Sequence, residues 1–293
     1  MTHSHSGSDP VFKLAQQRVS KLLKKIQAEA PDASAAVPHT LSPVLVHSLR
    51  VCTKRLRALL QLYRPVAGKT AIRAVDQSIK ALANSYSGQR DAVVQYETLC
   101  HLVEQYQQSH GCDMQPLLDH FSACLLEENE VATPMEPNAG FQDILARWQS
   151  KLKGKKQPDF ESGLEYAYRK ARKLAYEAEA SDDDEVYHQC RKWAKYYLYQ
   201  LQMLLDKPRP RDKALIRQLK ALGELLGVFH DRCVLEQSLN RILTKPVRDE
   251  ALEQATLLML TWLIEQKRLD KKQCQEWFEG VFSRPHNGVK LKG

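Results

Sequence analysis

The residues of this sequence with the clearest chemical character are two sets of a histidine, an arginine and a lysine at matched spacing. His47, Arg50 and Lys54 form a His-x-x-Arg-x-x-x-Lys pattern, which recurs at residues 188–195. On a helix that turns about 100° per residue, positions i, i+3 and i+7 fall on one side. Guanidinium and ammonium groups bind phosphate oxygens, and an imidazole donates hydrogen bonds to them. Each pattern therefore predicts one side of an anion-binding surface.

The first stripe of cations, which Arg57 extends, has no acidic compensation within its own helix. No Asp or Glu occurs from Val44 to Val75. Aligned cations repel one another, so an exposed row of them costs stability unless a counter-anion is present. A stripe from residue 47 to 57 extends about 15 Å along a helix, which suits a repeating polyanion better than a single phosphate. A solvated helix face is the alternative for one isolated stripe, but two stripes in matched register favour a polyanion.

The matched spacing belongs to a repeat that covers most of the chain. His47, Arg50 and Lys54 fall on His188, Arg191 and Lys195 at an offset of 141 residues. The positions that match are disproportionately cationic, and such self-similarity predicts an internal duplication. Further matched pairs, at offsets of 140 or 148, are Arg73 with Lys213, Lys80 with Lys220, Lys21 with Arg169, Lys24 with Arg172, and Lys25 with Lys173.

Charge is distributed unevenly along the chain, whose formal net charge is +8. Fourteen Lys or Arg occur from Lys13 to Arg90, whereas residues 92–146 contain none and hold nine Asp or Glu. Separated basic and acidic faces favour an anionic partner on the basic one. The acidic segment 92–146 leaves an alternative open, in which it docks a basic protein and the cationic stripes are incidental.

Helical periodicity dominates the sequence, and no stretch alternates convincingly at period two. The expected fold is therefore all-α. We expect single helices to end near residue 226 and near residue 267, with new helices starting at 229 and 271. The expected organisation is a flexible N-terminus at 1–10, two helical halves at 11–151 and 159–282 within one domain, and a flexible C-terminal tail at 283–293. No apolar run approaches the roughly 20 residues that cross a bilayer, and no secretory signal is evident, so we expect a cytoplasmic protein without membrane contact.

Four segments of the sequence resemble the hallmark of the CHAD family, the conserved histidine α-helical domain. They are Val46 to Arg57, His188 to Lys195, Gly88-Gln-Arg-Asp91 and Leu222 to Asp231, although the third is one residue shorter than the family pattern. The resemblance covers roughly residues 10–280. It implies two pseudo-symmetric bundles of about four helices each, with a basic groove or channel between them. It also implies binding of inorganic polyphosphate, localisation to polyphosphate granules, and granule-associated proteins as further partners.

The cations of the two stripes and of their flanks are the expected polyphosphate ligands, with Arg50 and Arg191 foremost because a guanidinium presents a planar fork to phosphate oxygens. We expect the second stripe to have fewer cations than the first, because Tyr196 and Leu198 stand where the first half has Arg55 and Arg57. The expected ligands are Lys21, Lys24, Lys25, His47, Arg50, Lys54, Arg57, Arg169, Arg172, Lys173, His188, Arg191, Lys192 and Lys195, with Arg73, Lys80, Arg90, Lys213 and Lys220 in a second tier.

Other chemistries fit the sequence less well. His47, His188 and His230 lack metal-ligand spacing and stand among cations, so we expect no metal and no cofactor. The histidines alternatively make capping or interhelical contacts. Asp91 and Asp231 are expected to orient a neighbouring Arg or His, and they do not supply the carboxylate cluster of a phosphohydrolase, so we expect no enzyme. Nucleic acid is the main rival ligand, although no recognition helix or aromatic platform is evident.

Overall fold

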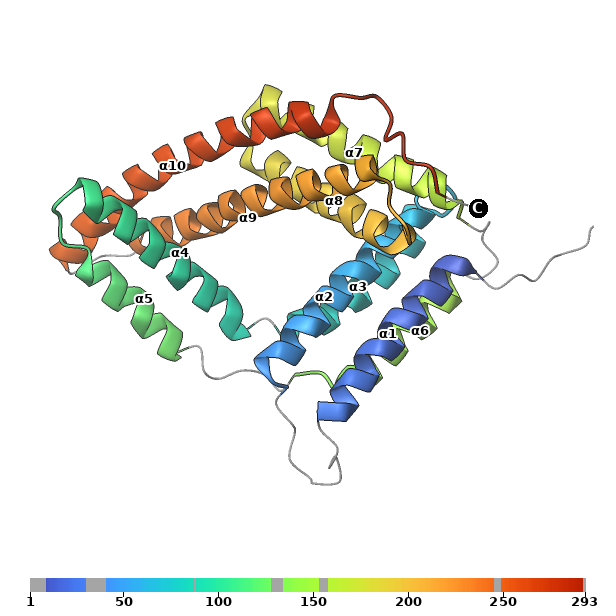
Figure 1. Cartoon of the computed structure of the whole chain (residues 1–293). Coiled ribbons are helices and arrows are strands. Elements are labelled where there is room, and N and C mark those ends of the chain that lie inside the picture. Colours follow the sequence, from blue (N-terminus) through green and yellow to red (C-terminus); the bar gives the residue numbers. More distant parts are fainter. Residues whose placement is uncertain are drawn as a thin grey trace, which may run out of the picture.

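Ten α-helices and one turn of 3₁₀ helix make up the described part of the chain, and this part contains no strand (Figure 1). The computed structural model describes residues 9–29, 41–86, 88–127, 134–152, 158–244 and 249–291, without the side chains of 88–91 and 126–127. The expected all-α fold is confirmed. The elements are α1 Pro10–Glu29, α2 Pro43–Leu60, η1 Gln61–Tyr63, α3 Lys69–Asn84, α4 Gly88–Ser109, α5 Gln115–Glu127, α6 Pro137–Leu152, α7 Phe160–Ser181, α8 Asp184–Leu204, α9 Pro210–Thr244 and α10 Glu250–Phe282.

Short polar side chains begin the helices that carry the stripes. The Ser42 hydroxyl accepts a hydrogen bond from the backbone N–H of Leu45 at the start of α2, and Pro43 follows it. The carboxylate of Asp183 accepts from the N–H of Glu185 at the start of α8. Both contacts satisfy backbone donors that an α-helix leaves open in its first turn. The positions of the two stripes along their helices are therefore fixed locally by sequence.

The helices α9 and α10 are continuous over 35 and 33 residues, where the sequence predicted two helices in each place. The expected break in α9 falls at residues 227–228, and Gly227 is buried inside the helix. The expected break in α10 lies between Lys267 and Asp270, whose charged side chains are also buried. Glycine and charge usually mark helix ends or surfaces, but here tertiary packing compensates for the weak local preference for helix.

Two hydrophobic cores hold the helices together. The larger core joins α1, α2, α3 and α6 to α7, α8, the first part of α9 and the end of α10. The smaller core joins α4 and α5 to the remaining parts of α9 and α10. Figure 1 shows α4 and α5 at the far end of the two long helices, away from α1 and α6. These cores cross the boundary expected between 11–151 and 159–282, and the duplication itself stays a prediction.

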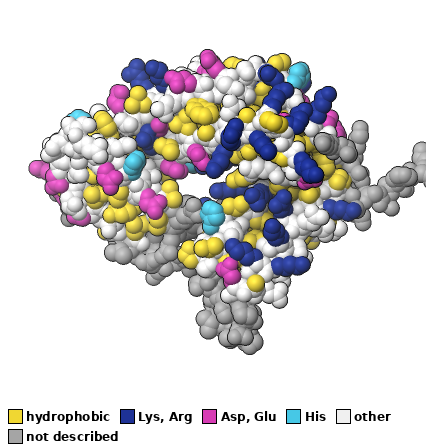
Figure 2. Space-filling model, viewed as in Figure 1, with side chains coloured by type: hydrophobic (Ala, Val, Ile, Leu, Met, Phe, Trp, Pro, Cys, Tyr) yellow, Lys and Arg dark blue, Asp and Glu magenta, His cyan; other side chains and the backbone are white. Residues whose placement is uncertain are grey.

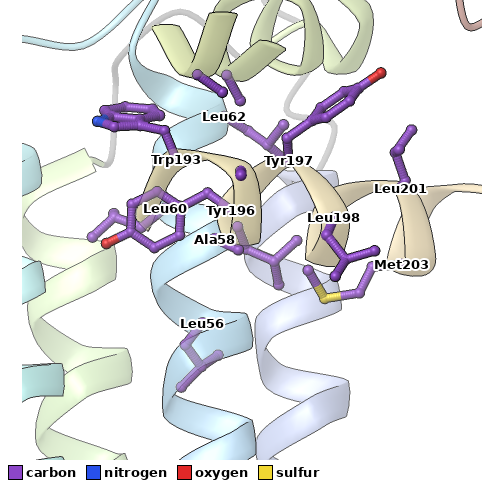
Figure 3. Close-up of a cluster of buried hydrophobic side chains, with 14 of the residues drawn as sticks. Leu56, Ala58, Leu60, Leu62, Trp193, Tyr196, Tyr197, Leu198, Leu201 and Met203 are labelled. Carbon is purple, nitrogen blue, oxygen red and sulfur yellow. The ribbon is translucent and has the colours of Figure 1, made fainter. Parts of the chain in front are cut away.

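The helices α2 and α8 cross inside the larger core (Figure 3). The side-chain amide of Gln200 donates to the carbonyl oxygen of Ala58 at 2.8 Å, which ties one helix to the other in the dry interior. Both residues are fully buried. The side chains of this crossing that Figure 3 labels are Leu56, Ala58, Leu60, Leu62, Trp193, Tyr196, Tyr197, Leu198, Leu201 and Met203.

The described part of the C-terminal segment, residues 283–291, contacts α7, and the expectation of a flexible tail at 283–293 stays a prediction. The Tyr168 hydroxyl of α7 donates to the carbonyl oxygen of Arg284 at 2.6 Å. The carboxylate of Glu165 accepts from the backbone N–H of Asn287 at 3.1 Å, and Val289 is buried. These contacts could not be expected from local sequence, because they come from a helix more than 100 residues away. The expected flexible residues 1–8 lie outside the described residues, whereas Asp9 accepts from two N–H groups at the start of α1.

A buried ion network fixes the start of α8 to the two long helices. Lys267 of α10 binds the carboxylates of Asp184 on α8 and Glu236 on α9. Close by, Arg232 of α9 binds Asp270 of α10 at 2.7 Å, and both side chains are buried. Removing one partner of such a pair leaves an uncompensated buried charge, which is strongly destabilising. The network therefore sets the register of α9 against α10.

Gly163 supplies a test of the packing between α7 and η1, the turn that follows α2. A Cβ at this position would lie 2.8 Å from the backbone carbonyl oxygen of Leu62, so backbone would have to move. We expect Gly163→Ala to lower the free energy of unfolding by about 1–3 kcal/mol. Gly280→Ala is the matched control, because nothing lies within 4 Å of the Cβ it adds in α10. The control should be neutral or stabilising by up to about 1 kcal/mol. Urea unfolding measures both, and equal effects at the two sites would contradict the packing.

Candidate anion-binding surface

The first stripe lies on the outer side of α2. His47 and Lys54 are exposed, and Arg50 is half-buried. The guanidinium of Arg50 donates from Nη1 to the carbonyl oxygen of Tyr86, at the end of α3, at 3.4 Å. Because the opposite side of α2 is held in the core by residues such as Leu49, the three polar side chains are directed outward. The structure thus places the first stripe as the sequence predicted.

The helix α1 adds cations beside this stripe. Lys25 donates from Nζ to the Ser48 hydroxyl of α2 at 3.3 Å, and it also lies 3.8 Å from the carboxylate of Glu29. Lys21 and Lys24 are exposed on the same helix. The helix α1 packs along α2 in the larger core, so its lysines extend the cationic surface sideways.

The second stripe lies against α9, where two glycines make room for it. A Cβ at Gly223 would lie 3.3 Å from Cε of Lys195, and one at Gly227 would lie 3.5 Å from Nη2 of Arg191. A methyl group at position 223 would be tight against Lys195, whereas one at position 227 would make an ordinary contact with Arg191, so only bulkier side chains would displace both cations from α9. The glycines of the Leu222 to Asp231 segment therefore let two long cationic side chains lie flat on a neighbouring helix.

Burial disfavours the charged forms of Arg191 and Lys195. It lowers the pKa of both groups, and the positive charge of Arg191 lowers the pKa of Lys195 further. Asp231 is close enough to oppose both shifts, which agrees with its expected role of orienting a neighbouring arginine. The Nε atom of Arg191 is buried and has no hydrogen-bond partner. An additional anion here would stabilise charge that the protein alone compensates incompletely.

The two histidines of the second half form a pair. Nδ1 of His188 lies 3.1 Å from Nδ1 of His230, and the ring centroids are 4.5 Å apart. Burial, followed by the charges of His188 and Arg191, lowers the pKa of His230 to about 4. Burial also lowers the pKa of His188, with Arg191 and Lys192 adding to the effect and Glu185 opposing it. Near neutral pH both rings are uncharged, so one donates and the other accepts.

The pair borders a cavity of about 380 Å³ whose other walls include Asp183, Asp184 and Glu236. His47, the third histidine weighed as a metal ligand, lies apart on α2. Among the described residues, no group of three or more His, Cys, Asp or Glu is placed to hold a metal ion. The geometry of the pair is that of an interhelical contact between α8 and α9.

Arg57 is compensated, contrary to the expectation from its own helix. Its Nε donates to Asp76 of α3 at 2.7 Å, and Lys80 lies 3.5 Å from the same carboxylate. Asp76 is the first acidic residue after the stretch from Val44 to Val75, which contains no Asp or Glu. It reaches Arg57 only because α3 packs beside α2. Arg57 therefore does not continue the outer stripe as a free cation.

The three cations expected from α7 have partners outside α2 and α9. Arg169 binds Glu165 at 2.6 Å and also contacts His286 of the C-terminal segment. Arg172 donates from Nε to the carbonyl oxygen of Phe282 at 2.9 Å. Lys173 lies 3.3 Å from Glu177 one turn away. The structure assigns two of these residues to anchoring the C-terminal region, which their match with Lys21, Lys24 and Lys25 did not indicate.

The second-tier residues are divided. Arg73 and Lys213 are exposed, and Lys220 lies 3.8 Å from Glu224 on its own helix. Lys80 is engaged with Asp76 as described above. The side chains of Arg90 and Asp91 lie outside the described residues.

The structure adds Arg55 and Tyr199 to this region, and neither was expected there from the sequence. Tyr199 of α8 lies near both Arg191 and Arg55, whose charges lower its pKa against the larger raising effect of burial. The Nε atom of Arg55, like that of Arg191, is buried without a hydrogen-bond partner. Arg55 lies outside the helical stripe by angle, and only the crossing of α2 with α8 reveals that it faces the second half.

Figure 2 shows where charge gathers on the view used in Figure 1. Lys and Arg side chains cluster mainly over the part formed by α2, α3, α8 and the start of α9, while Asp and Glu side chains mark the far end, where α4 and α5 lie. The charge separation expected from the sequence is thus also a separation in space. Within the described residues, no helix is long and apolar enough to cross a membrane.

The chain matches the CHAD domain family over residues 17–240, and it belongs to this family. Its fold is similar to that of the CHAD domain from the plant Ricinus communis, with a TM-score of 0.65 and 18% identity over 96% of this chain and 94% of that one. It is also similar to PptA from Streptomyces chartreusis, with a TM-score of 0.64 and 12% identity over 94% of this chain and 98% of that one. No curated protein matches the chain in sequence.

The histidine pair predicts a pH-dependent stability. As pH falls from about 6.5 to about 4, the unfolded chain takes up a proton at position 230 before the folded chain does, so the folded state loses stability in this window. His230→Gln removes that loss. The free energy of unfolding of the variant, relative to the natural chain, should therefore rise between about pH 8 and about pH 5.

Urea unfolding at the two pH values measures this difference. His101→Gln, at an exposed position of α4, is the matched control for loss of an imidazole. A difference between His230→Gln and the natural chain that is the same at both pH values would contradict the role given to the pair.

Proposed function

We propose that this protein binds inorganic polyphosphate without catalysis, through the cationic surface formed by α1, α2 and α8. The observation that carries the proposal is the placement of Arg191 and Lys195. Both are half-buried against Gly227 and Gly223, and their charge is compensated incompletely by the protein. Together with the exposed stripe on α2, they offer binding groups for successive phosphates of a long chain. Membership of the CHAD family supports the same ligand.

The proposed surface consists of one guanidinium-bearing stripe on each of two crossing helices, flanked by the lysines of α1. Arg50 and Arg191 supply planar forks, and Lys54 and Lys195 supply point charges. His47 and His188 supply neutral donors where the chain passes them. We propose that the protein is cytoplasmic and associates with polyphosphate granules, where granule-associated proteins are further partners.

Nucleic acid is the alternative ligand, because its backbone is also a phosphate polyanion. Single strands are usually held by exposed aromatic side chains on which bases stack. The aromatic residues of the α2–α8 crossing, such as Tyr197, are instead buried in the core. At equal phosphate concentration, we also expect long-chain polyphosphate to displace duplex DNA. Displacement of polyphosphate by DNA or RNA would contradict the preference.

Replacing the two arginines tests the surface directly. In the double variant Arg50→Gln and Arg191→Gln, each lost charge-assisted contact should weaken binding of long-chain polyphosphate about tenfold or more. The matched control is Lys151→Gln with Lys272→Gln, which removes the same charge from exposed positions on α6 and α10. Fluorescence titration with long-chain polyphosphate measures the affinity, and circular dichroism verifies folding. Equal losses in the two double variants would argue for unspecific attraction.

Salt dependence provides an independent test of electrostatic capture. Binding that uses about 6–10 phosphate contacts should lose ~10³–10⁵ in affinity between roughly 50 and 200 mM salt, by analogy with DNA. The double arginine variant should show a shallower dependence, because it releases fewer counterions. Titrations at several salt concentrations measure the slope. An affinity that does not change with salt would rule out the proposed mode of binding.

A further inference from the structure

A second group of cations lies on the side of α8 that is turned to α3. It joins Arg57 of α2, Asp76 and Lys80 of α3, and Lys192 and Tyr196 of α8, and we call it the α3 cluster. The side chains of Arg191 and Lys195 lie instead against α9. Although Arg57 and Lys192 come from regions that carry the predicted stripes, the structure gives them a different set of neighbours.

One carboxylate organises the cations of the α3 cluster. Asp76 accepts from Nε of Arg57 at 2.7 Å through Oδ1, and its Oδ2 lies 3.5 Å from Nζ of Lys80. The guanidinium carbon of Arg57 lies 5.8 Å from the ring centroid of Tyr196. A guanidinium has five N–H donors, so the bond from Nε to Asp76 leaves four with which Arg57 can bind a ligand. Asp76 therefore orients Arg57 and leaves N–H donors of its guanidinium available for a ligand.

The Tyr196 hydroxyl is the unusual feature of the cluster. The residue is only 5% exposed, and its hydroxyl oxygen is buried without a hydrogen-bond partner. Figure 3 shows this hydroxyl pointing away from Leu198 and Met203, whose side chains fill the core. A buried hydroxyl without a partner is costly, and most such groups in proteins are satisfied. Because the Arg57 guanidinium lies near the Tyr196 ring, an anion bound by Arg57 could offer this hydroxyl an acceptor.

Positive charge exceeds negative charge around Lys192. Burial lowers the pKa of Lys192, and the charges of Arg57, Lys80 and Arg64 lower it further, against a single opposing carboxylate from Asp76. Three cations thus act on Lys192 against one carboxylate. The arrangement is compact rather than extended, since three helices bring these side chains together from different directions. Compact positive charge that one carboxylate compensates only in part suits one group of high charge density.

We propose that the α3 cluster is a second anion site, separate from the polyphosphate surface, that binds one phosphoryl group through Arg57, Lys80, Lys192 and the Tyr196 hydroxyl. The phosphoryl group is either free phosphate or the end of a phosphate chain, which share this chemistry. The inference stands on the contacts of the cluster and does not depend on the polyphosphate proposal.

Isothermal titration of the full chain with inorganic phosphate tests the site. Tyr196→Phe should weaken phosphate binding about tenfold, because it removes a hydrogen bond to a charged group. It should leave the urea midpoint unchanged or higher, since the hydroxyl that it removes has no partner in the fold. Lys192→Gln should weaken binding as well, whereas Asp76→Asn should tighten it by removing the competing negative charge.

Two controls separate this site from the polyphosphate surface. Arg191→Gln should leave the affinity for inorganic phosphate unchanged, and Tyr196→Phe should leave most of the affinity for long-chain polyphosphate. Two sites are supported if Arg191→Gln weakens polyphosphate binding alone and the variants of the α3 cluster alter phosphate binding alone. Absence of phosphate binding, or phosphate binding that Tyr196→Phe and Lys192→Gln do not alter, would overturn the inference whatever the outcome for polyphosphate.

The source of the phosphoryl group is decided by comparing chain lengths. If the α3 cluster binds chain ends, tripolyphosphate should compete with inorganic phosphate more strongly than long-chain polyphosphate does at equal total phosphate. If the site takes free phosphate, neither chain should compete, and binding of inorganic phosphate should be the same in their presence.

Discussion

The crossing of α2 with α8 is the constraint on which the rest of the structure depends. The two helices approach closely at Ala58, whose carbonyl accepts the amide of Gln200 in the core. Because the central faces of both helices are buried there, their polar side chains are forced to the edges of the contact. One edge of α8 meets α9 and carries Arg191, and another carries Lys192, which is close enough to Asp76 and Lys80 of α3 to feel their charges. The distribution of cations is therefore a product of helix packing as much as of sequence.

Glycine and carboxylate control the cations at these two edges in different ways. Against α9, Gly223 and Gly227 provide space, so that the hydrocarbon part of Lys195 and the guanidinium of Arg191 lie close to this helix while their charge stays poorly compensated. Against α3, Asp76 provides a counter-charge and a fixed orientation for Arg57. The first arrangement stores unfavourable electrostatic energy that an anion can relieve. The second produces a cluster that is already ordered.

Local patterns were sufficient to predict the helical class, the start of α8 and the outward stripe on α2. Each depends on residues within a few turns of one another, as the contact of Asp183 with the N–H of Glu185 illustrates. The continuity of α9 and α10 could not be predicted in this way, because Gly227 and Asp270 are stabilised by neighbours from other helices. The same reason explains Arg57, whose acidic partner follows it by 19 residues, and Arg172, whose partner follows by 110. Charge counted along a sequence does not register such pairs.

The long helices α9 and α10 pass through both cores, and this has a consequence for how the molecule opens. Leu222 of α9 belongs to the larger core, while Leu239 of the same helix belongs to the smaller one with α4 and α5. Local opening can release the smaller core while the ion network of Lys267 holds the rest. Backbone amides of the far half of α9 will then exchange with solvent sooner than those near Gly223. The two parts of α9 thus differ in how strongly their amides are protected from exchange. An anion bound beside Arg191 increases the protection of the part in the larger core only.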